Sequence, residues 1–575
     1  MMKHLLRRTL VICLMVSASH AVSAQDPSED IVEMGDTLVI QPTYDGSIMN
    51  ALNKWILWDH DGDYTNSPKH AVYKLLRGNV YIIQTTTELK GRLALVADKP
   101  DLDNPPPQII PMNDGETGFP WRMFAGGPFT MKNIHFTAFN PSTKTNQSWQ
   151  VYMQLKTSGE HTYIDGCYFE YLNAHLLQVK NDSNSIFMTN NFYSDGGHGE
   201  PHVWQGNFYN SEAFMQDTLV IKNNTYINTP GNLVNIRQQM TRYVEISNNT
   251  LINTGGHLFF TTFWTETVIK NNLFYNVFGR GENDIERASQ EPDGLAFSII
   301  NVDTLAGEFE MKDPTWYARE SERRIEVKNN YYGWDDELEA LWAGRDTVYA
   351  PEWMNSRTIA MFADDTNYPL FIEENTETKA SIGIPTFETP IPTTANFIKW
   401  LDEGCWGSPQ DATIRFAWEP EGADVPNKDL EWPPLEDLRL TSTAFVGDDG
   451  LPLGDQNWYA DRAVRWDMTG WGRDAVGISE RIADNTSLKL QSYPNPFSSE
   501  ARIDLVLDRS ENVSLTVFDI TGKRVATLMS GQKGIGTHSV VWDGTSSSGL
   551  DLPGGMYLLH LKTDSKSSAV RMIKQ

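Results

Sequence analysis

The chain has few cysteines, few basic residues and few long apolar runs, and each shortage excludes a class of protein. Three cysteines in 575 residues are too few for a disulfide scaffold. Lysine and arginine number 47 against 75 acidic residues, a formal net charge of −28, so nucleic acid is not expected as a partner. Beyond the N-terminus, no stretch approaches the roughly 18 apolar residues of a membrane span.

The N-terminus has the order of a secretory signal. Lys3, Arg7 and Arg8 precede the apolar run 9–17, and the small residues 22–24 follow before the acidic mature start. We therefore expect residues 1–24 to be a signal peptide. The mature protein would then be secreted from a Gram-negative bacterium or attached to its surface.

Two cysteines remain after that cut, Cys167 and Cys405. We expect Cys167 to be an interior thiol, because it stands where related segments have an interior asparagine. A bridge between Cys167 and Cys405 is the alternative.

What the chain does contain is a repeat. Seven segments are variants of one order: apolar, polar, Asn-Asn, then aromatic or β-branched residues. They are MKNIHF (131–136), IDGCYF (164–169), MTNNFY (188–193), IKNNTY (221–226), ISNNTL (246–251), IKNNLF (269–274) and VKNNYY (327–332). A period in the twenties with insertions indicates a solenoid of stacked coils. Asparagines one coil apart can then form hydrogen-bonded ladders at a buried corner.

The repeat resembles the right-handed parallel β-helix of the pectate-lyase-like superfamily. We expect a mainly β chain: a right-handed parallel β-helix solenoid with an N-terminal cap over 25–345, then an irregular Trp- and Pro-rich capping region over 346–487. Residues 47–59 have helical apolar spacing and would cover the open end of the solenoid. Residues 80–98 would form the first coils, and 101–126 a loop or irregular coil. The insertion 279–325 fits two coils as well as one long excursion.

The C-terminal residues 488–575 alternate apolar and polar positions between turns, which predicts a small Ig-like β-sandwich. Five motifs occur there in order: YPNPF (493–497), TGKRV (521–525), WDG (542–544), GGMY (554–557) and the basic close Arg571 to Lys574. Together they resemble the type A C-terminal sorting domain of the type IX secretion system. The resemblance implies the type IX machinery and the outer-membrane surface as partners. An ordinary Ig-like binding module is the alternative. Residues 351–362 and 447–459 resemble segments of surface β-helix proteins of Bacteroidota.

Five segments that precede the repeats predict a candidate site. They are VYMQLK (151–156), HLLQVK (175–180), HVWQGN (202–207), NLVNIR (232–237) and HLFFTT (257–262). Because alternate side chains of a strand face opposite ways, aligning them stacks His, Gln and Lys or Arg on the outer face. The second position breaks the alternation, which predicts a bend there. The candidate substrate-binding residues are Gln154, Lys156, Gln178, Gln205, Asn235 and His257.

Such a basic stripe on an acidic protein suits an extended acidic polysaccharide. In β-helix polysaccharide lyases, the resemblance implies, a Lys or Arg removes the proton beside a uronate carboxylate. Neighbouring cations, calcium or amides mask the carboxylate charge. Adjacent positive charge lowers the pKa of a lysine base from its usual value of about 10.4. The candidate base is Lys180, and Arg237 and Gln178 are expected to mask the charge of the carboxylate. His175, His202 or His257 would assist protonation. The alternative is a non-catalytic surface adhesin or glycan-binding solenoid.

No cofactor follows from the sequence. Calcium is a candidate, but no cluster of Asp and Glu lies among the outward positions to hold it, so no metal ligands are predicted. The Gly-His-Gly at 197–199 is like that of polygalacturonases, but the paired aspartates of inverting hydrolysis are absent. We expect the protein to be a monomer.

Overall fold

The computed structural model describes two compact units, within residues 1–468 and 469–575. In the first unit it describes residues 32–41, 52–98, 105–111, 122–137, 139–140, 145–146, 151–172, 174–196, 206–211, 214–236, 240–260, 263–282, 298–305, 320–389, 391, 393–406 and 437–459. In the second it describes residues 489–493, 497, 499–507, 510–519, 524–534, 536–547, 549–563 and 567–574. The signal peptide predicted for residues 1–24 lies outside the described residues.

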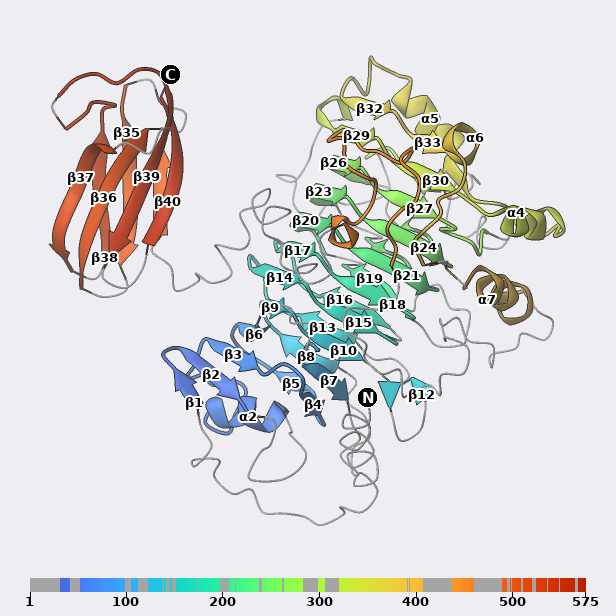
Figure 1. The fold of residues 1–575 in the computed structure, drawn as a ribbon, viewed down its shortest axis with the longest axis horizontal. Coiled ribbons are helices and arrows are strands. Elements are labelled where there is room, and N and C mark those ends of the chain that lie inside the picture. The colour runs from blue at the N-terminus through green and yellow to red at the C-terminus, as the bar shows by residue number, and fades with distance from the viewer. Residues whose placement is uncertain are drawn as a thin grey trace, which may run out of the picture. The chain divides into compact units, whose positions relative to one another are not determined.

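The first unit is a parallel β-helix whose coils add strands to three long sheets (Figure 1). The 12-stranded sheet contains β1 (Val32–Met34), β2 (Thr37–Ile40), β3 (Val72–Leu75), β6 (Leu93–Ala97), β9 (Phe129–Lys132), β14 (His161–Asp165), β17 (Ser185–Thr189), β20 (Gln216–Lys222), β23 (Thr241–Ser247), β26 (Trp264–Lys270), β29 (Arg324–Lys328) and β32 (Phe371–Glu374). The 10-stranded sheet contains β4 (Val80–Ile83), β7 (Gln108–Pro111), β10 (His135–Thr137), β15 (Tyr168–Glu170), β18 (Phe192–Ser194), β21 (Thr225–Thr229), β24 (Thr250–Thr254), β27 (Leu273–Tyr275), β30 (Tyr331–Gly333) and β33 (Glu377–Thr378). The seven-stranded sheet contains β5 (Thr87–Glu88), β8 (Arg122–Gly126), β13 (Val151–Leu155), β16 (His175–Val179), β19 (Asn207–Asn210), β22 (Val234–Asn235) and β25 (Phe259–Phe260).

The first asparagine of each repeat makes the turn between two sheets. Six asparagines adopt a left-handed backbone with φ between 52° and 60°, and Gly166 takes the same position with φ 64°. Asparagine tolerates this conformation better than other residues that carry a side chain. The six are Asn133, Asn190, Asn223, Asn248, Asn271 and Asn329.

The second asparagine of each repeat forms a buried ladder, as predicted. The Asn249 amide nitrogen donates to Asn272 Oδ1 at 2.9 Å and to the Ile221 carbonyl at 2.9 Å. Its oxygen accepts from the backbone and side-chain nitrogens of Asn224, both at 3.0 Å. The same contacts repeat through Asn191, Asn224, Asn249, Asn272 and Asn330. The side-chain amides of these second asparagines are therefore paired with one another and with the backbone.

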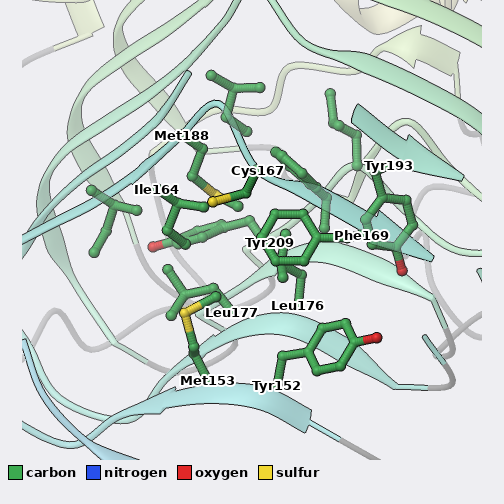
Figure 2. Packing of buried hydrophobic residues seen from close by; sticks show 14 of the residues in the cluster. Tyr152, Met153, Ile164, Cys167, Phe169, Leu176, Leu177, Met188, Tyr193 and Tyr209 are labelled. Atoms are coloured by element: carbon green, nitrogen blue, oxygen red, sulfur yellow. The ribbon is translucent and has the colours of Figure 1, made fainter. Parts of the chain in front are cut away.

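Cys167 occupies the ladder position of its coil. Its backbone N–H donates to Asn191 Oδ1 at 2.9 Å, and Figure 2 shows the thiol among Ile164, Met188 and Phe169. Both Cys167 and Cys405 are buried free cysteines, so the interior-thiol prediction is confirmed and the alternative bridge is not formed. Burial raises the pKa of the Cys167 thiol to about 12, which keeps it protonated and unreactive.

The N-terminal cap contains the predicted helix, α2 (Leu52–Asp59), whose Leu52, Trp55 and Ile56 are fully buried in the core. The first coils begin earlier than predicted, because β2 already pairs in parallel with β3. The expectation of an irregular segment at 101–126 was wrong where the structure describes it: β7 and β8 are regular strands of two sheets.

The insertion before the last repeat is one excursion. Strand β26 pairs directly with β29, and β27 pairs directly with β30, so no further coil of these two sheets lies between them. The solenoid also extends past residue 345, where the sequence analysis ended it, because β32 and β33 add strands to two sheets.

Short elements lie outside the three long sheets. They are the hairpin β11 (Phe139–Asn140) and β12 (Thr145–Asn146), the parallel pair β28 (Ser298–Ile300) and β31 (Glu352–Met354), the 3-10 turns η2 (Glu320–Glu322) and η4 (Gln456–Trp458), the helices α4 (Asp336–Ala343), α5 (Ser356–Phe362), α6 (Lys379–Ile382) and α7 (Thr393–Lys399), and the π-helical turn η3 (Trp400–Cys405). Helices α4 and α7 share a buried cluster that includes Trp342, Phe397 and Trp400. Among the described residues, no helix has the length and apolar character that crossing a membrane requires.

Residues 437–459, which we call the strap, lie along the 10-stranded sheet. Trp458 packs against Phe192, and its indole nitrogen donates to Thr225 Oγ1 at 2.7 Å. The fully buried Asp455 carboxylate accepts from the Thr225 hydroxyl at 2.8 Å. Part of the predicted irregular region is therefore a cover for the outer face of this sheet.

Gly454 is expected to control docking of the strap. It has φ +91°, and a Cβ atom there would lie 2.3 Å from Thr250 Oγ1. Gly454→Ala should therefore release Trp458, which would shift its fluorescence to the red and open the strap to proteolysis. Gly450→Ala is the matched control, since Gly450 also has a positive φ but nothing within 4 Å of a Cβ. Equal behaviour of the two variants would contradict this account.

The second unit is an antiparallel β-sandwich, as predicted. One sheet contains β34 (Lys489–Tyr493), β35 (Ala501–Leu507) and β38 (Gly536–Trp542). The other contains β36 (Glu511–Asp519), β37 (Arg524–Lys533), β39 (Gly555–Thr563) and β40 (Ser567–Lys574). Its buried apolar side chains form one cluster between the sheets.

Four of the five sorting-domain motifs meet around Trp542. The Trp542 ring lies 5.4 Å from both the Phe497 and the Tyr557 rings. The buried Lys574 ammonium donates to the carbonyls of Gly544 at 3.2 Å and Leu552 at 2.7 Å, and pairs with Asp551. These four motifs are thus parts of one core. TGKRV lies largely outside the described residues.

Candidate functional site

The candidate site is the outer face of the seven-stranded sheet, which we call the polar stripe. Its first column holds Val151, His175, Asn207, Asn232 and His257, and its second holds Gln154, Gln178, Asn210, Asn235 and Phe260. Direct backbone pairing places every residue of the second column and Val151, His175 and Asn207 of the first. Asn232 and His257 take their places from the paired residues Asn235 and Phe260, which follow three positions later. Lys156 and Lys180 follow directly after strands β13 and β16.

The predicted bend separates the two columns. Tyr152 and Met153 are neighbours in the chain, yet both are fully buried in the solenoid core. The same holds for the pairs Leu176–Leu177, Phe208–Tyr209, Leu233–Val234 and Leu258–Phe259. Two adjacent inward side chains leave the residues on either side of them facing outward. The bend therefore turns the first column away from the core.

The alignment of the third coil was wrong. His175 pairs with Asn207, and Gln178 pairs with Asn210, so residues 207–210 fill the place that we gave to 202–205. The sequence NFYN has the same polar–apolar–apolar–polar order as HLLQ in β16, which is the signal that could have found it. His202 and Gln205 therefore do not hold these two columns, and they lie outside the described residues.

Amide groups link the coils of the polar stripe. The Gln154 side-chain nitrogen donates to Gln178 Oε1 at 2.6 Å. The two His175 ring nitrogens lie 3.2 Å and 2.9 Å from the amide nitrogens of Asn207 and Asn210. Gln154 is nearly buried, whereas His175 and Gln178 are half-buried. Much of the predicted substrate surface is thus an internal hydrogen-bonded ladder.

The N-terminal end of the polar stripe is neutralised by a residue that sequence reasoning missed. The Lys156 ammonium lies 2.8 Å from Glu88, and the Arg122 guanidinium lies 3.3 Å from the same carboxylate. The hydrogen bond from Lys156 holds the pKa of Glu88 below its usual range, although burial opposes this. Glu88 is 68 residues away from Lys156 in sequence, so the spacing of the repeats carries no sign of this pair.

Lys180 is in a different position from Lys156. It is half-buried, and among the described residues no carboxylate lies within 4.0 Å of its ammonium group. Gln178, two residues earlier on the same face, uses its oxygen to accept from Gln154. That leaves the Gln178 amide N–H groups available as donors beside the Lys180 ammonium.

His175 is a neutral imidazole near neutral pH. Burial, and secondarily the positive charge of Lys180, lowers its pKa from 6.5 to about 4. A neutral ring can accept a proton but cannot donate one as an imidazolium. The expected role of His175 as a proton donor is therefore not supported at neutral pH.

The C-terminal end of the polar stripe is closed to solvent. Asn235 and His257 are nearly fully buried, and His257 lies 3.7 Å from the buried carboxylate of Glu282. Asn232, between them in the fold, is fully buried, and neither of its amide atoms has a hydrogen-bond partner among the described residues. Direct contact of Asn235 or His257 with a polymer would require the covering residues to move. Arg237 lies outside the described residues.

No metal site was found in the described part of the chain, where no three His, Cys, Asp or Glu side chains gather closely enough to hold an ion. Asp182 accepts a backbone hydrogen bond from Met215 at 2.8 Å, and Asp195 sits in a left-handed turn. Both therefore shape turns. Calcium remains a candidate cofactor for which the described residues offer no set of ligands.

The pH dependence of stability tests the environment of His175. Because its pKa is lower in the folded chain, the unfolded chain binds more protons between about pH 4 and 6.5. The contribution of neutral His175 is therefore complete above pH 6.5 and is lost as the pH falls toward 4. His175→Gln should reduce the drop in urea midpoint between pH 7 and pH 4.5. Lys180→Met should reduce it partly, and the exposed control His161→Gln should not.

Comparisons with known proteins match small parts of the chain. Residues 496–567 match the family model of the FlgD Ig-like domain. A crystal structure of dimeric latent PorU from Porphyromonas gingivalis is 22% identical over 16% of this chain and 9% of its own, with a TM-score of 0.14. PorZ, a surface component of the type IX secretion system of the same organism, is 18% identical over 19% of this chain and 12% of its own, with a TM-score of 0.12. This chain thus spans a small fraction of either protein. No curated protein matches.

Proposed function

We propose that this protein is an exported surface solenoid that binds an acidic polysaccharide along the polar stripe. The single observation behind this proposal is the Lys180 ammonium beside the amide N–H groups of Gln178, neither of which has a side-chain partner among the described residues. A sugar carboxylate would accept hydrogen bonds from both groups at once. On a chain of net charge −28, such a local cation is needed for any anionic ligand to bind.

The same site has a second candidate function, β-elimination. The favouring observation is that Lys180 follows Gln178 by two residues on the same face, so that one side chain could act as a base while the other binds the carboxylate. As a neutral amine, Lys180 would take the proton next to the uronate carboxylate and become an ammonium, while Gln178 and Arg237 mask the charge of the carboxylate. The sugar–oxygen bond on the neighbouring carbon would then break as a carbon–carbon double bond forms. The leaving oxygen would take its proton from water or from another group, since neutral His175 cannot supply it.

Binding is tested with polygalacturonate, alginate, ulvan and chondroitin sulfate by calorimetry at low salt. Lys180→Ala should weaken binding about tenfold or more, the typical effect of losing a charged hydrogen bond. Lys74→Ala is the matched control, because this substitution also removes one positive charge, but from β3, which belongs to a different sheet. If none of the four polymers binds, or if both variants weaken binding equally, the proposal fails.

Catalysis is tested separately by the ultraviolet absorbance of new unsaturated uronate ends. Absorbance that rises with the native chain and not with Lys180→Ala would support elimination with Lys180 as the base. Cleavage that persists in Lys180→Ala would rule out this assignment. Binding without any absorbance would leave a non-catalytic glycan-binding solenoid.

We further propose that residues 488–575 direct secretion through the type IX system. The convergence of four sorting motifs on Trp542 supports this. Deleting residues 488–575 in a host with this system should trap the chain in the periplasm. Surface delivery of the truncated chain would contradict the assignment and favour an ordinary Ig-like module.

A further inference from the structure

The last coil of the β-helix leaves an open cavity of about 770 Å³ beside its aromatic core. It lies where β30, β31, α5 and β32 come together at the end of the solenoid, near the labels β32 and α5 in Figure 1. Its described lining residues are Tyr332, Trp334, Pro351, Glu352, Trp353, Met354, Ile359, Phe362, Ala363 and Glu373. This volume is typical of ligand pockets.

The cavity exists because an interior column ends there. Coil by coil, Phe136, Phe169, Tyr193, Tyr226, Leu251, Phe274 and Tyr332 occupy one interior position. The next residue in that register is Thr378, which has no ring to continue the stack. Trp353 stacks on Tyr332 instead, with ring centroids 4.7 Å apart and planes inclined by 2°.

The aromatic wall of the cavity is held in place. Trp334 meets Tyr332 edge-on at 5.6 Å, and its indole nitrogen donates to the Val277 carbonyl at 2.8 Å. The rings of Tyr332, Trp334 and Trp353 all remain partly exposed. A wall that does not have to reorganise loses little entropy when a flat ligand binds to it.

The polar groups of the cavity are two carboxylates. Glu352 and Glu373 are exposed, and in the described part of the chain neither forms an ion pair. Burial, and secondarily the charge of Glu373, raises the pKa of the Tyr332 hydroxyl, which places that carboxylate near the aromatic wall. No lysine or arginine is among the described lining residues. An anionic ligand would therefore be repelled.

We propose that this cavity binds a neutral oligosaccharide. The apolar faces of sugar rings would lie on the partly exposed aromatic wall, and their hydroxyl groups would donate to Glu352 and Glu373. A cage around a cationic group is less suited to this arrangement, because Tyr332 and Trp353 cover one another's faces rather than converging on one point. This site is separate from the polar stripe and independent of the proposed function.

The test is calorimetric titration of the full mature chain with cellohexaose, laminarihexaose, mannohexaose and xylohexaose, and with hexalysine. We expect one of the neutral sugars to bind and hexalysine not to bind. Trp353→Ala should weaken that binding about tenfold or more. Trp353 also packs on the core, so its loss could affect folding as well as binding. Glu373 is exposed, and Glu373→Lys should therefore weaken sugar binding without unfolding the chain.

Two controls separate this site from its surroundings. Glu374, the next residue on β32, lies 3.7 Å from Lys328 and does not line the cavity, so Glu374→Lys should bind the sugar normally. Lys180→Ala should also bind it normally, which distinguishes failure here from failure of the polar stripe. The proposal is overturned if no neutral sugar binds, if hexalysine binds instead, or if Glu373→Lys and Glu374→Lys behave alike.

Discussion

Asn249→Ala is expected to lower the free energy of unfolding of the β-helix by about 3–5 kcal/mol. The substitution removes an amide that takes part in four hydrogen bonds of the interior ladder. It also takes the acceptor from the buried Asn224 backbone N–H, and removes one hydrogen bond each from Asn272 Oδ1 and the Ile221 carbonyl. An unsatisfied buried group typically costs about 1–3 kcal/mol, and a connected network adds to this. The measurement is urea unfolding of the full chain, followed by tryptophan fluorescence.

The ladder provides its own controls. Asn367 is exposed and its amide donates to nearby Asp364, so Asn367→Ala should change stability by less than about 1 kcal/mol. Cys167→Asn should be tolerated, because Cys167 already occupies a position of the ladder. Its backbone N–H donates to Asn191 Oδ1, as the second asparagines of the other coils do with their neighbours. If Asn249→Ala proved as mild as Asn367→Ala, the ladder would not be a main source of stability.

Asp59→Ala is expected to destabilise the N-terminal cap by a similar amount, about 3–5 kcal/mol, as is usual when one partner of a buried ionic cluster is removed. The Asp59 carboxylate is fully buried at the end of α2. It pairs with the His70 ring and accepts from the Tyr73 hydroxyl at 2.8 Å. Its loss removes the acceptor of the buried Tyr73 hydroxyl and one buried partner of the His70 ring. Burial together with Asp59 already raises the pKa of Tyr73.

A neighbouring ion pair gives the matched control for this prediction. Asp61 lies 2.7 Å from Lys69 but is 68% exposed, so Asp61→Ala should cost less than about 1 kcal/mol. Trp55 and Trp58 lie on the same helix and report unfolding of the cap by fluorescence. Equal effects of Asp59→Ala and Asp61→Ala would show that burial does not decide the role of Asp59.

The sequence predicted best what is local and repeated. Each Asn-Asn segment meets the same turn, the same interior corner and the same neighbours above and below. The pattern therefore indicated the coils, the buried asparagine ladder and the position of Cys167 in it. The alternation in the C-terminal residues indicated the sandwich for the same reason, because a strand half-buried in a sheet has a period of two.

The sequence misled where loops of unequal length separate the coils. A five-residue shift put His202 where Asn207 lies, since both segments have a polar residue followed by apolar ones. Only pairing with His175 decides between them. A register error of this kind changes which side chains reach the surface, so the candidate site was predicted in outline and not residue by residue.

What the sequence alone determined is the coil: its period, its corner asparagines and the outward position of Gln178 and Lys180. What only the tertiary structure decided is which charges and rings are free. Glu88 neutralises Lys156 from 68 residues away, the strap covers one sheet, and Trp353 completes a column that Thr378 cannot continue. Such contacts depend on the register of distant segments, and no local pattern of residue types encodes that register.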